Sequence, residues 1–77
     1  MELAGQIKRL RSENDLSQDD LASRIYVSRQ TISNWENDKT YPDVQSLLLL
    51  SATFDVSVDS LIKGDVTAME EIIGNKD

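Results

Sequence analysis

One short segment of the chain combines side chains whose types and spacing suit a specific hydrogen-bonding chemistry. Residues 29–36 read Arg-Gln-Thr-Ile-Ser-Asn-Trp-Glu. Ile32 and Trp35 lie three positions apart, so on a helix they share one face and are predicted to point inward. The other side then carries two rows with a spacing of four, Arg29 with Ser33 and Gln30 with Asn34. Arginine binds guanine and glutamine or asparagine binds adenine through paired hydrogen bonds, so this face has the groups that read base edges.

Two helices are predicted before this polar face. Apolar residues at helical spacing indicate a first amphipathic helix over about residues 2–13. Ser17, followed three residues later by Asp20, predicts the start of a second helix that ends near residue 27. Ser28 is then placed to cap the third helix. Two short helices joined by a turn of about three residues can hold one helix in the major groove while the other braces it.

Two further helices are predicted after the polar face. Residues 37–42 are polar and end in proline, which indicates a loop. Asp43 can cap a fourth helix, and its four consecutive leucines at 47–50 suggest deep burial. Ser57 opens a short fifth helix that Gly64 can terminate.

The expected fold class is therefore all-α, a compact five-helix bundle with a helix-turn-helix. A chain of 77 residues allows one small domain, predicted over residues 1–64. Trp35 has a possible stacking role against bases, but its spacing with Ile32 assigns it to the core. The predicted core consists of Leu10, Leu21, Ala22, Ile25, Ile32, Trp35, Leu47, Leu48 and Leu61.

Residues 65–77 are predicted to stand apart as an acidic amphipathic tail or as the start of a linker to a missing domain. The tail places four apolar residues at helical spacing, Val66, Met69, Ile72 and Ile73. An isolated helix of this length is marginal, so its apolar face needs a partner. That partner is the domain itself, a second copy, or an effector domain or separate protein, and the sequence leaves these alternatives open.

The charge balance argues against a nucleic-acid partner. Fourteen acidic and eight basic residues give a net charge of −6, whereas nucleic-acid binders are usually basic. Half of this charge, −3, lies in residues 65–77. DNA binding therefore requires the basic residues to gather on one face, with the acids turned elsewhere: Lys8, Arg9, Arg11, Arg24, Arg29 and Lys39.

Composition also excludes several classes of function. The chain has no cysteine and no histidine, which rules out disulfides and the commonest zinc sites, and we expect no cofactor. It has no glycine-rich phosphate loop and no carboxylate pair at a spacing typical of acid-base catalysis, so an enzyme is not expected. The longest apolar run is the four leucines at 47–50, so we expect no membrane contact and a cytoplasmic location.

The segments 16–22, 27–37, 41–43 and 54–64 together resemble the lambda-repressor-like helix-turn-helix family, of the Cro/repressor and xenobiotic-response-element type. The resemblance covers about residues 3–64 and leaves only the tail outside. It implies a five-helix regulator of bacterial or phage transcription, expected to be a repressor. The implied partner is a double-stranded DNA operator, bound by a homodimer with the recognition helix at about residues 28–37 in the major groove.

The resemblance also implies roles for individual residues. Base contacts are expected from Arg29, Gln30, Ser33 and Asn34. Phosphate contacts are expected from Gln18, Ser28, Asn37 and Lys39, although helix capping alone also explains Ser28. Arg11 and Glu36 are expected to form a partly buried ion pair between the first and third helices, which is a structural role.

The chain departs from the family pattern in its turns. Many relatives have glycine where this chain has Tyr26 and Asp38, and both positions are candidates for positive φ. Aspartate tolerates that region, but tyrosine there costs on the order of 1–2 kcal/mol, which packing of its ring would have to offset. We predict that Tyr26 has positive φ or that the turn differs.

A protein-interaction module is the competing function. An antitoxin-like or adaptor domain keeps the helix-turn-helix shape and uses its acidic surface and apolar tail to hold a protein partner. The net charge favours this alternative. The polar face of the third helix opposes it, because protein hot spots favour aromatic and apolar anchors.

Overall fold

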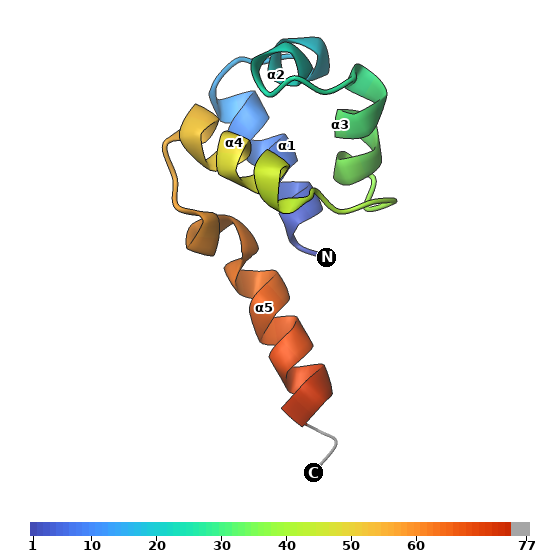
Figure 1. Ribbon diagram of the computed structural model, residues 1–77, viewed down its shortest axis with the longest axis vertical. Helices are drawn as coiled ribbons and strands as arrows, with labels where there is room; N and C mark the ends of the chain where they lie inside the picture. Colours follow the sequence, from blue (N-terminus) through green and yellow to red (C-terminus); the bar gives the residue numbers. More distant parts are fainter. Residues whose placement is uncertain (75–77) are drawn as a thin grey trace.

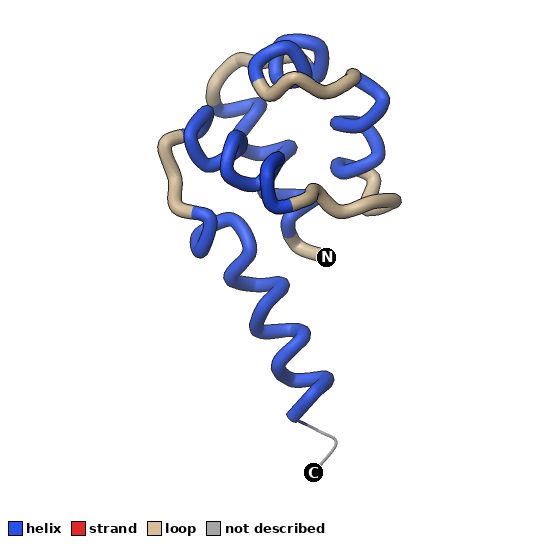
Figure 2. Tube along the Cα trace, viewed as in Figure 1, coloured by secondary structure: helices blue, strands red, loops and turns tan. Residues whose placement is uncertain are grey.

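The computed structural model describes residues 1–74, and within that range it contains helices and loops but no strand (Figure 2). Five helices follow one another along the chain: α1 (Leu3–Glu13), α2 (Gln18–Arg24), α3 (Arg29–Glu36), α4 (Val44–Phe54) and α5 (Val58–Gly74). The first four helices and the start of α5 surround one core, and the second half of α5 projects away from it (Figure 1). The predicted all-α fold with a helix-turn-helix is confirmed.

Side-chain caps fix where α2, α3 and α4 begin, at the predicted residues. Ser17 Oγ accepts the Asp20 N–H and the Asp20 carboxylate accepts the Ser17 N–H, both at 3.0 Å, so these two residues form a capping box. Ser28 caps α3 through the Thr31 N–H. Asp43 caps α4 through the Ser46 N–H. These hydrogen bonds lower the pKa values of the Asp20 and Asp43 carboxyls below their ordinary values.

The chain leaves each of the first four helices through a residue with positive φ. Asp15, Asp38 and Asp55 have φ of 55°, 57° and 53°, and Tyr26 has φ of 61°. Aspartate is one of the few residues other than glycine that enters this region at low cost. The predictions for Tyr26 and Asp38 are confirmed. The tyrosine ring, however, is 84% exposed, so packing does not offset its backbone strain.

The core is built from all five helices. Seven of the nine predicted core residues are buried: Leu10, Leu21, Ala22, Ile25, Ile32, Trp35 and Leu61. Leu47 is partly buried and packs against this cluster. The prediction for Leu48 is wrong, because its side chain is 58% exposed. Four consecutive helical residues span about 300° of the helix circumference, so they cannot all face one core, and Leu50 occupies the inward position.

The prediction that Gly64 ends the fifth helix is also wrong, since α5 continues without a break to Gly74. A Cβ atom at Gly64 would collide with the Glu2 carboxylate. Glycine therefore leaves room for the Glu2 side chain beside α5, where a larger residue would have to displace the end of that side chain. The predicted amphipathic segment is the second half of this same helix, and the functional division of the chain at residue 64 stays a prediction.

Asp65, assigned by sequence to a separate tail, is a buried part of the domain with only 3% of its surface exposed. Its carboxylate accepts the backbone N–H groups of Glu2 and Leu3, at 2.5 and 3.1 Å, and the Tyr41 hydroxyl at 2.8 Å. Glu2 makes no capping bond with its own side chain, so Asp65 caps α1 from α5. Burial of the Tyr41 hydroxyl and its hydrogen bond to Asp65 raise the pKa of Tyr41.

The strain at Tyr26 predicts that Tyr26→Gly stabilises the domain. Glycine adopts positive φ without a steric penalty and gives up little buried area, because the ring is exposed. After the entropy cost of glycine in the unfolded chain, we expect a gain of about 0.5–1 kcal/mol in the free energy of unfolding, measured by urea denaturation. Tyr26→Ala keeps the Cβ atom and should gain nothing. An equal gain from alanine would show that φ is not the origin of the effect.

Candidate nucleic-acid interface

The polar face of α3 is turned away from the core. Ile32 and Trp35 anchor the inner side of the helix and are 0% and 5% exposed. On the outer side, Arg29 and Gln30 are exposed, and Ser33 and Asn34 are partly exposed. The structure therefore brings together the four residues predicted to contact bases, and it leaves them accessible to a partner.

Two of these side chains orient each other before any partner binds. The Gln30 Nε2 donates to the Asn34 Oδ1 at 3.0 Å, across one helical turn. This exposed bond uses one donor of Gln30 and the acceptor of Asn34, and it leaves the Gln30 carbonyl and the Asn34 amide N–H groups free. An adenine edge presents one acceptor and one donor. The Gln30 or the Asn34 amide can match that pair when the hydrogen bond between the two side chains is replaced by bonds to the base.

A shallow hollow beside α3 collects polar groups from two helices. It has a volume of ≈ 230 Å³, and its lining residues are Gln18, Arg29, Gln30 and Ser33. Gln18 comes from the first residue of α2, whose N-terminus carries free backbone N–H groups. A guanidinium, amides and a hydroxyl therefore converge on one site that suits an oxygen-rich, negatively charged group.

The four residues predicted to contact phosphates differ in how free they are. The Ser28 hydroxyl is bonded to the Thr31 N–H and lies 2.9 Å from the Thr31 hydroxyl. The Asn37 amide donates to the Ser33 carbonyl at 2.9 Å, so it closes the end of α3. Lys39 is exposed, and its backbone N–H is bonded to the Asn34 carbonyl at 2.8 Å. Capping therefore accounts for the present contacts of Ser28 and Asn37, and phosphate contacts by all four residues stay a prediction.

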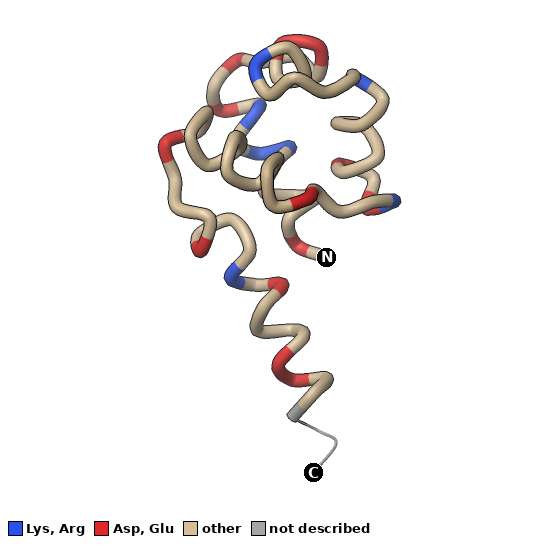
Figure 3. The backbone as a smooth tube through the Cα atoms, in the orientation of Figure 1, with Lys and Arg blue, Asp and Glu red and all other residues tan. Residues whose placement is uncertain are grey.

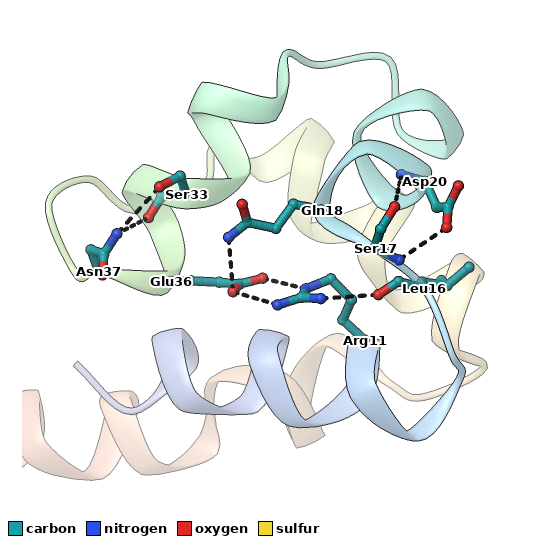
Figure 4. Close-up of polar contacts among 8 residues, drawn as sticks. All are labelled: Arg11, Leu16, Ser17, Gln18, Asp20, Ser33, Glu36 and Asn37. Atoms are coloured by element: carbon teal, nitrogen blue, oxygen red, sulfur yellow. Dashed lines mark hydrogen bonds and ion pairs between the residues drawn. The ribbon is translucent and has the colours of Figure 1, made fainter.

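A nearly buried ion pair fixes the C-terminal end of α3 (Figure 4). The Arg11 guanidinium donates to both oxygens of Glu36, at 2.8 and 3.0 Å, and to the Leu16 carbonyl at 3.0 Å. Gln18 Nε2 donates to the same Glu36 carboxylate at 3.2 Å. The side chains of Arg11 and Glu36 are 17% and 4% exposed. Hydrogen bonding to Glu36 raises the pKa of Arg11, and the predicted ion pair between the first and third helices is present.

Two of the six basic residues that the sequence argument required are already paired with acids. Arg11 is committed to Glu36, and Arg9 forms an exposed pair with Glu13 at 2.9 Å. Lysine and arginine positions are spread along the chain and alternate with acidic ones (Figure 3). Among the exposed bases, Arg29 belongs to the polar face and Lys39 lies in the loop that follows α3. Any DNA binding must therefore depend on a few local contacts and not on a broad positive surface.

Within residues 1–74, no helix is both long enough and apolar enough to cross a membrane. The same range contains no cluster of acidic side chains arranged to hold a metal ion.

The short α2, the turn at Tyr26 and the outward polar face of α3 define a helix-turn-helix domain. The chain belongs to the helix-turn-helix family, which matches residues 7–61. It is 42% identical over 65 residues to the HTH-type transcriptional activator BcrR of Enterococcus faecalis, covering 84% of this chain and 32% of that protein. It is 36% identical over 61 residues to the repressor protein C2 of Salmonella phage P22, covering 79% of this chain and 28% of that protein. The chain thus spans about a third of these relatives.

Solved structures give the same assignment. The P22 c2 repressor in complex with a synthetic operator has a TM-score of 0.77 and 34% identity, over 80% of this chain and 94% of that one. SinR in complex with DNA has a TM-score of 0.72 and 33% identity, over 78% of this chain and 97% of that one. These relatives are transcriptional regulators, a class without enzymatic activity, as the sequence predicts.

Sequence reasoning missed two parts of the framework around this site. The first is the Asp65 carboxylate, which joins α1, α5 and the loop after α3 through Tyr41. The second is the Leu16 carbonyl, which accepts a third hydrogen bond from the Arg11 guanidinium. A dipeptide of glycine and aspartate inside an apolar helical pattern is the signal that could have revealed the first. Nothing in the sequence marks a backbone carbonyl as a partner.

The burial of Glu36 predicts a large loss of stability when its partner is removed. Arg11→Met should lower the free energy of unfolding by about 3 kcal/mol, because it leaves a carboxylate unpaired in the interior. The double variant Arg11→Met/Glu36→Met should recover most of this loss. Arg9→Met is the matched control, since its exposed pair should contribute at most about 0.5 kcal/mol. Urea denaturation measures all four proteins, and equal effects of Arg11→Met and Arg9→Met would contradict the role given to the buried pair.

Proposed function

We propose that this chain binds double-stranded DNA in a sequence-specific manner as a bacterial or phage transcriptional regulator. In this proposal α3, with its flanking residues over about 28–37, lies in the major groove. A cytoplasmic location, where such DNA is held, is part of the same proposal. The observation that carries it is the outward face of Arg29, Gln30, Ser33 and Asn34 on a helix whose inner side is fixed to the core.

Each side chain of this face has a definite task. Arg29 has two parallel donors that match the N7 and O6 acceptors of guanine. Gln30 and Asn34 carry one acceptor and two donors each, which match the N7 and N6 of adenine. Ser33 is the least specific of the four, because its hydroxyl both donates and accepts. Base reading is therefore assigned chiefly to Arg29, Gln30 and Asn34.

Phosphate contacts supply affinity in the proposal. Gln18, at the start of α2, lines the hollow beside Arg29 and is held by Glu36, so it meets a phosphate with little loss of freedom. Lys39 is exposed on the loop that follows α3. Ser28 and Asn37 lie at the two ends of α3, where exchange of their capping bonds lets them join the contact. The net charge of −6 predicts weak binding outside a matching sequence.

A dimer on a palindromic operator completes the proposal. Two copies reading half-sites about one helical turn apart, roughly 34 Å, combine two weak contacts into one specific complex. The P22 c2 repressor and SinR, whose domains this chain resembles, have both been solved with DNA. One curated relative is named an activator and another a repressor, so our expectation of repression rests on the lambda-repressor-like resemblance.

The competing protein-interaction module finds less support. The exposed face of α3 offers hydrogen-bonding groups and one guanidinium, without the aromatic anchors of a protein hot spot. The curated relatives described above are transcriptional regulators. An apolar surface suited to a protein lies on α5, away from this face, so protein binding and DNA binding can occur on one molecule.

Selection of bound sequences from a random double-stranded DNA pool at low salt tests the proposal. The wild-type chain should enrich a palindromic motif. Arg29→Ala should lose about 1–3 kcal/mol on that motif and accept other bases at the position Arg29 reads. Arg9→Ala removes the same charge from a residue already paired with Glu13, and it should keep the motif.

Two results would contradict the proposal. One is the absence of any enriched motif at low salt, where phosphate attraction is strongest. The other is an Arg29→Ala variant that weakens equally on all sequences, because a residue that reads a base affects mainly the sequences that contain that base.

A further inference from the structure

The second half of α5 carries an apolar face that nothing in the described domain covers. Val66, Met69, Ile72 and Ile73 are 42%, 55%, 66% and 63% exposed. At the base of this face lies a hollow of ≈ 420 Å³, lined by Met1, Tyr41, Ile62, Asp65, Val66 and Met69. Exposed apolar residues in such a continuous group usually mark an interaction surface.

The spacing of these residues identifies the kind of structure that fits the face. Ile62, Val66, Met69 and Ile73 are separated by four, three and four residues. This is the alternation that places apolar side chains along one seam between two packed helices. The occupant that matches the face is therefore another helix.

Charge beside the seam identifies which helix. Lys63 and Glu70 are seven residues apart and lie on the same flank of the seam. Both are exposed, and within residues 1–74 neither forms an ion pair. When two copies of one helix pack antiparallel about a two-fold axis, the same flank of each copy meets the other. Lys63 of one copy then approaches Glu70 of the second, and the contact occurs twice.

We propose that α5 is a homodimer interface in which two copies pack antiparallel along the seam of Ile62, Val66, Met69 and Ile73. In the matching register Val66 lies opposite Met69 of the second copy, and Ile62 lies opposite Ile73. Lys63 and Glu70 of opposite copies are then offset by about two residues, or ~3 Å along the axis, within reach of a lysine side chain. The Ile73 side chain of each copy enters the apolar hollow of the other.

A parallel pair does not satisfy the same groups. It brings the flank of Lys63 and Glu70 against the opposite flank, which carries Ile72 and the buried Asp65. Lys63 and Glu70 then lose each other as partners. The antiparallel arrangement is self-complementary in both apolar and charged contacts, so the helix needs no other sequence to cover it.

The interface rests on the proposed function in one respect, since reading a palindrome requires a two-fold arrangement of two copies. It also connects that arrangement to the DNA-binding side. Tyr41 lines the hollow that receives Ile73, donates to Asp65, and belongs to the loop that follows α3. In the dimer, Ile73 of one copy therefore lies against Tyr41, in the loop of the other copy that also carries Lys39.

Sedimentation equilibrium of the 77-residue chain without DNA tests the interface. The wild type should form dimers, and Met69→Glu should raise the dimer Kd by more than about a hundredfold, because it places two unpaired charges in the seam. Ala68→Glu adds the same charge off the seam and should change little. Circular dichroism checks that each variant folds. A wild type that stays monomeric over the whole concentration series, or a dimer that Met69→Glu leaves intact, overturns the proposal.

Charge exchange tests the antiparallel register. Lys63→Glu and Glu70→Lys should each raise the dimer Kd about tenfold, because each places like charges opposite one another. Mixing these two single variants should restore wild-type affinity, since the heterodimer pairs opposite charges at both contacts. A mixture no tighter than the single variants overturns the antiparallel arrangement.

Binding to a single DNA half-site, compared with a scrambled one, distinguishes failure of the interface from failure of the proposed function. Met69→Glu should still prefer the selected half-site over a scrambled one at low salt, because α3 is unchanged. A wild-type monomer that reads the half-site leaves the proposed function in place and removes the interface. A dimer that reads no sequence removes the function and leaves the interface.

Discussion

The carboxylate of Glu36 is the point at which α1, α2 and α3 meet. An ionised carboxylate that is 4% exposed is costly unless its oxygens are satisfied, and here Arg11 supplies two bonds and Gln18 a third. Because α3 has eight residues, it is too short to be stable on its own, and its direction depends on tertiary contacts. The ion pair and the buried Ile32 and Trp35 provide those contacts, and they fix which side of α3 faces outward.

The same arrangement makes an acidic chain compatible with a DNA partner. Glu36, the acid on the candidate recognition helix, is neutralised by Arg11, so it repels phosphate little. Several other acids serve at helix ends: Asp20 and Asp43 cap helix starts, and Asp15, Asp38 and Asp55 occupy positive φ after helices. Asp65 is buried as the cap of α1. Much of the negative charge therefore has a structural role, and in our proposal only a few residues contact DNA bases.

The parts of the fold that sequence could predict are those determined by neighbouring residues. Caps and periodicity located α1 to α4, whereas positive φ at residue 26 was predicted from the glycine that many relatives carry there. The errors concern residues whose surroundings come from distant segments. Gly64 has the sequence signal of a helix terminator but lies inside α5 beside the Glu2 side chain, and Asp65 has the signal of a solvated acid but caps α1. Leu48 shows that a run of leucines gives hydrophobicity but not direction. For the site, the residues could be grouped on one face, whereas the bonds that Ser28 and Asn37 already make could not be predicted.

The central claim is that α3, held by Glu36, reads base edges with Arg29, Gln30 and Asn34. A crystal structure of the chain bound to its selected DNA sequence tests this most directly. Our account predicts α3 in the major groove, hydrogen bonds from these three side chains to base edges, and an intact pair between Arg11 and Glu36. A complex in which the outer face of α3 points away from the bases, with DNA held elsewhere on the domain, would contradict it.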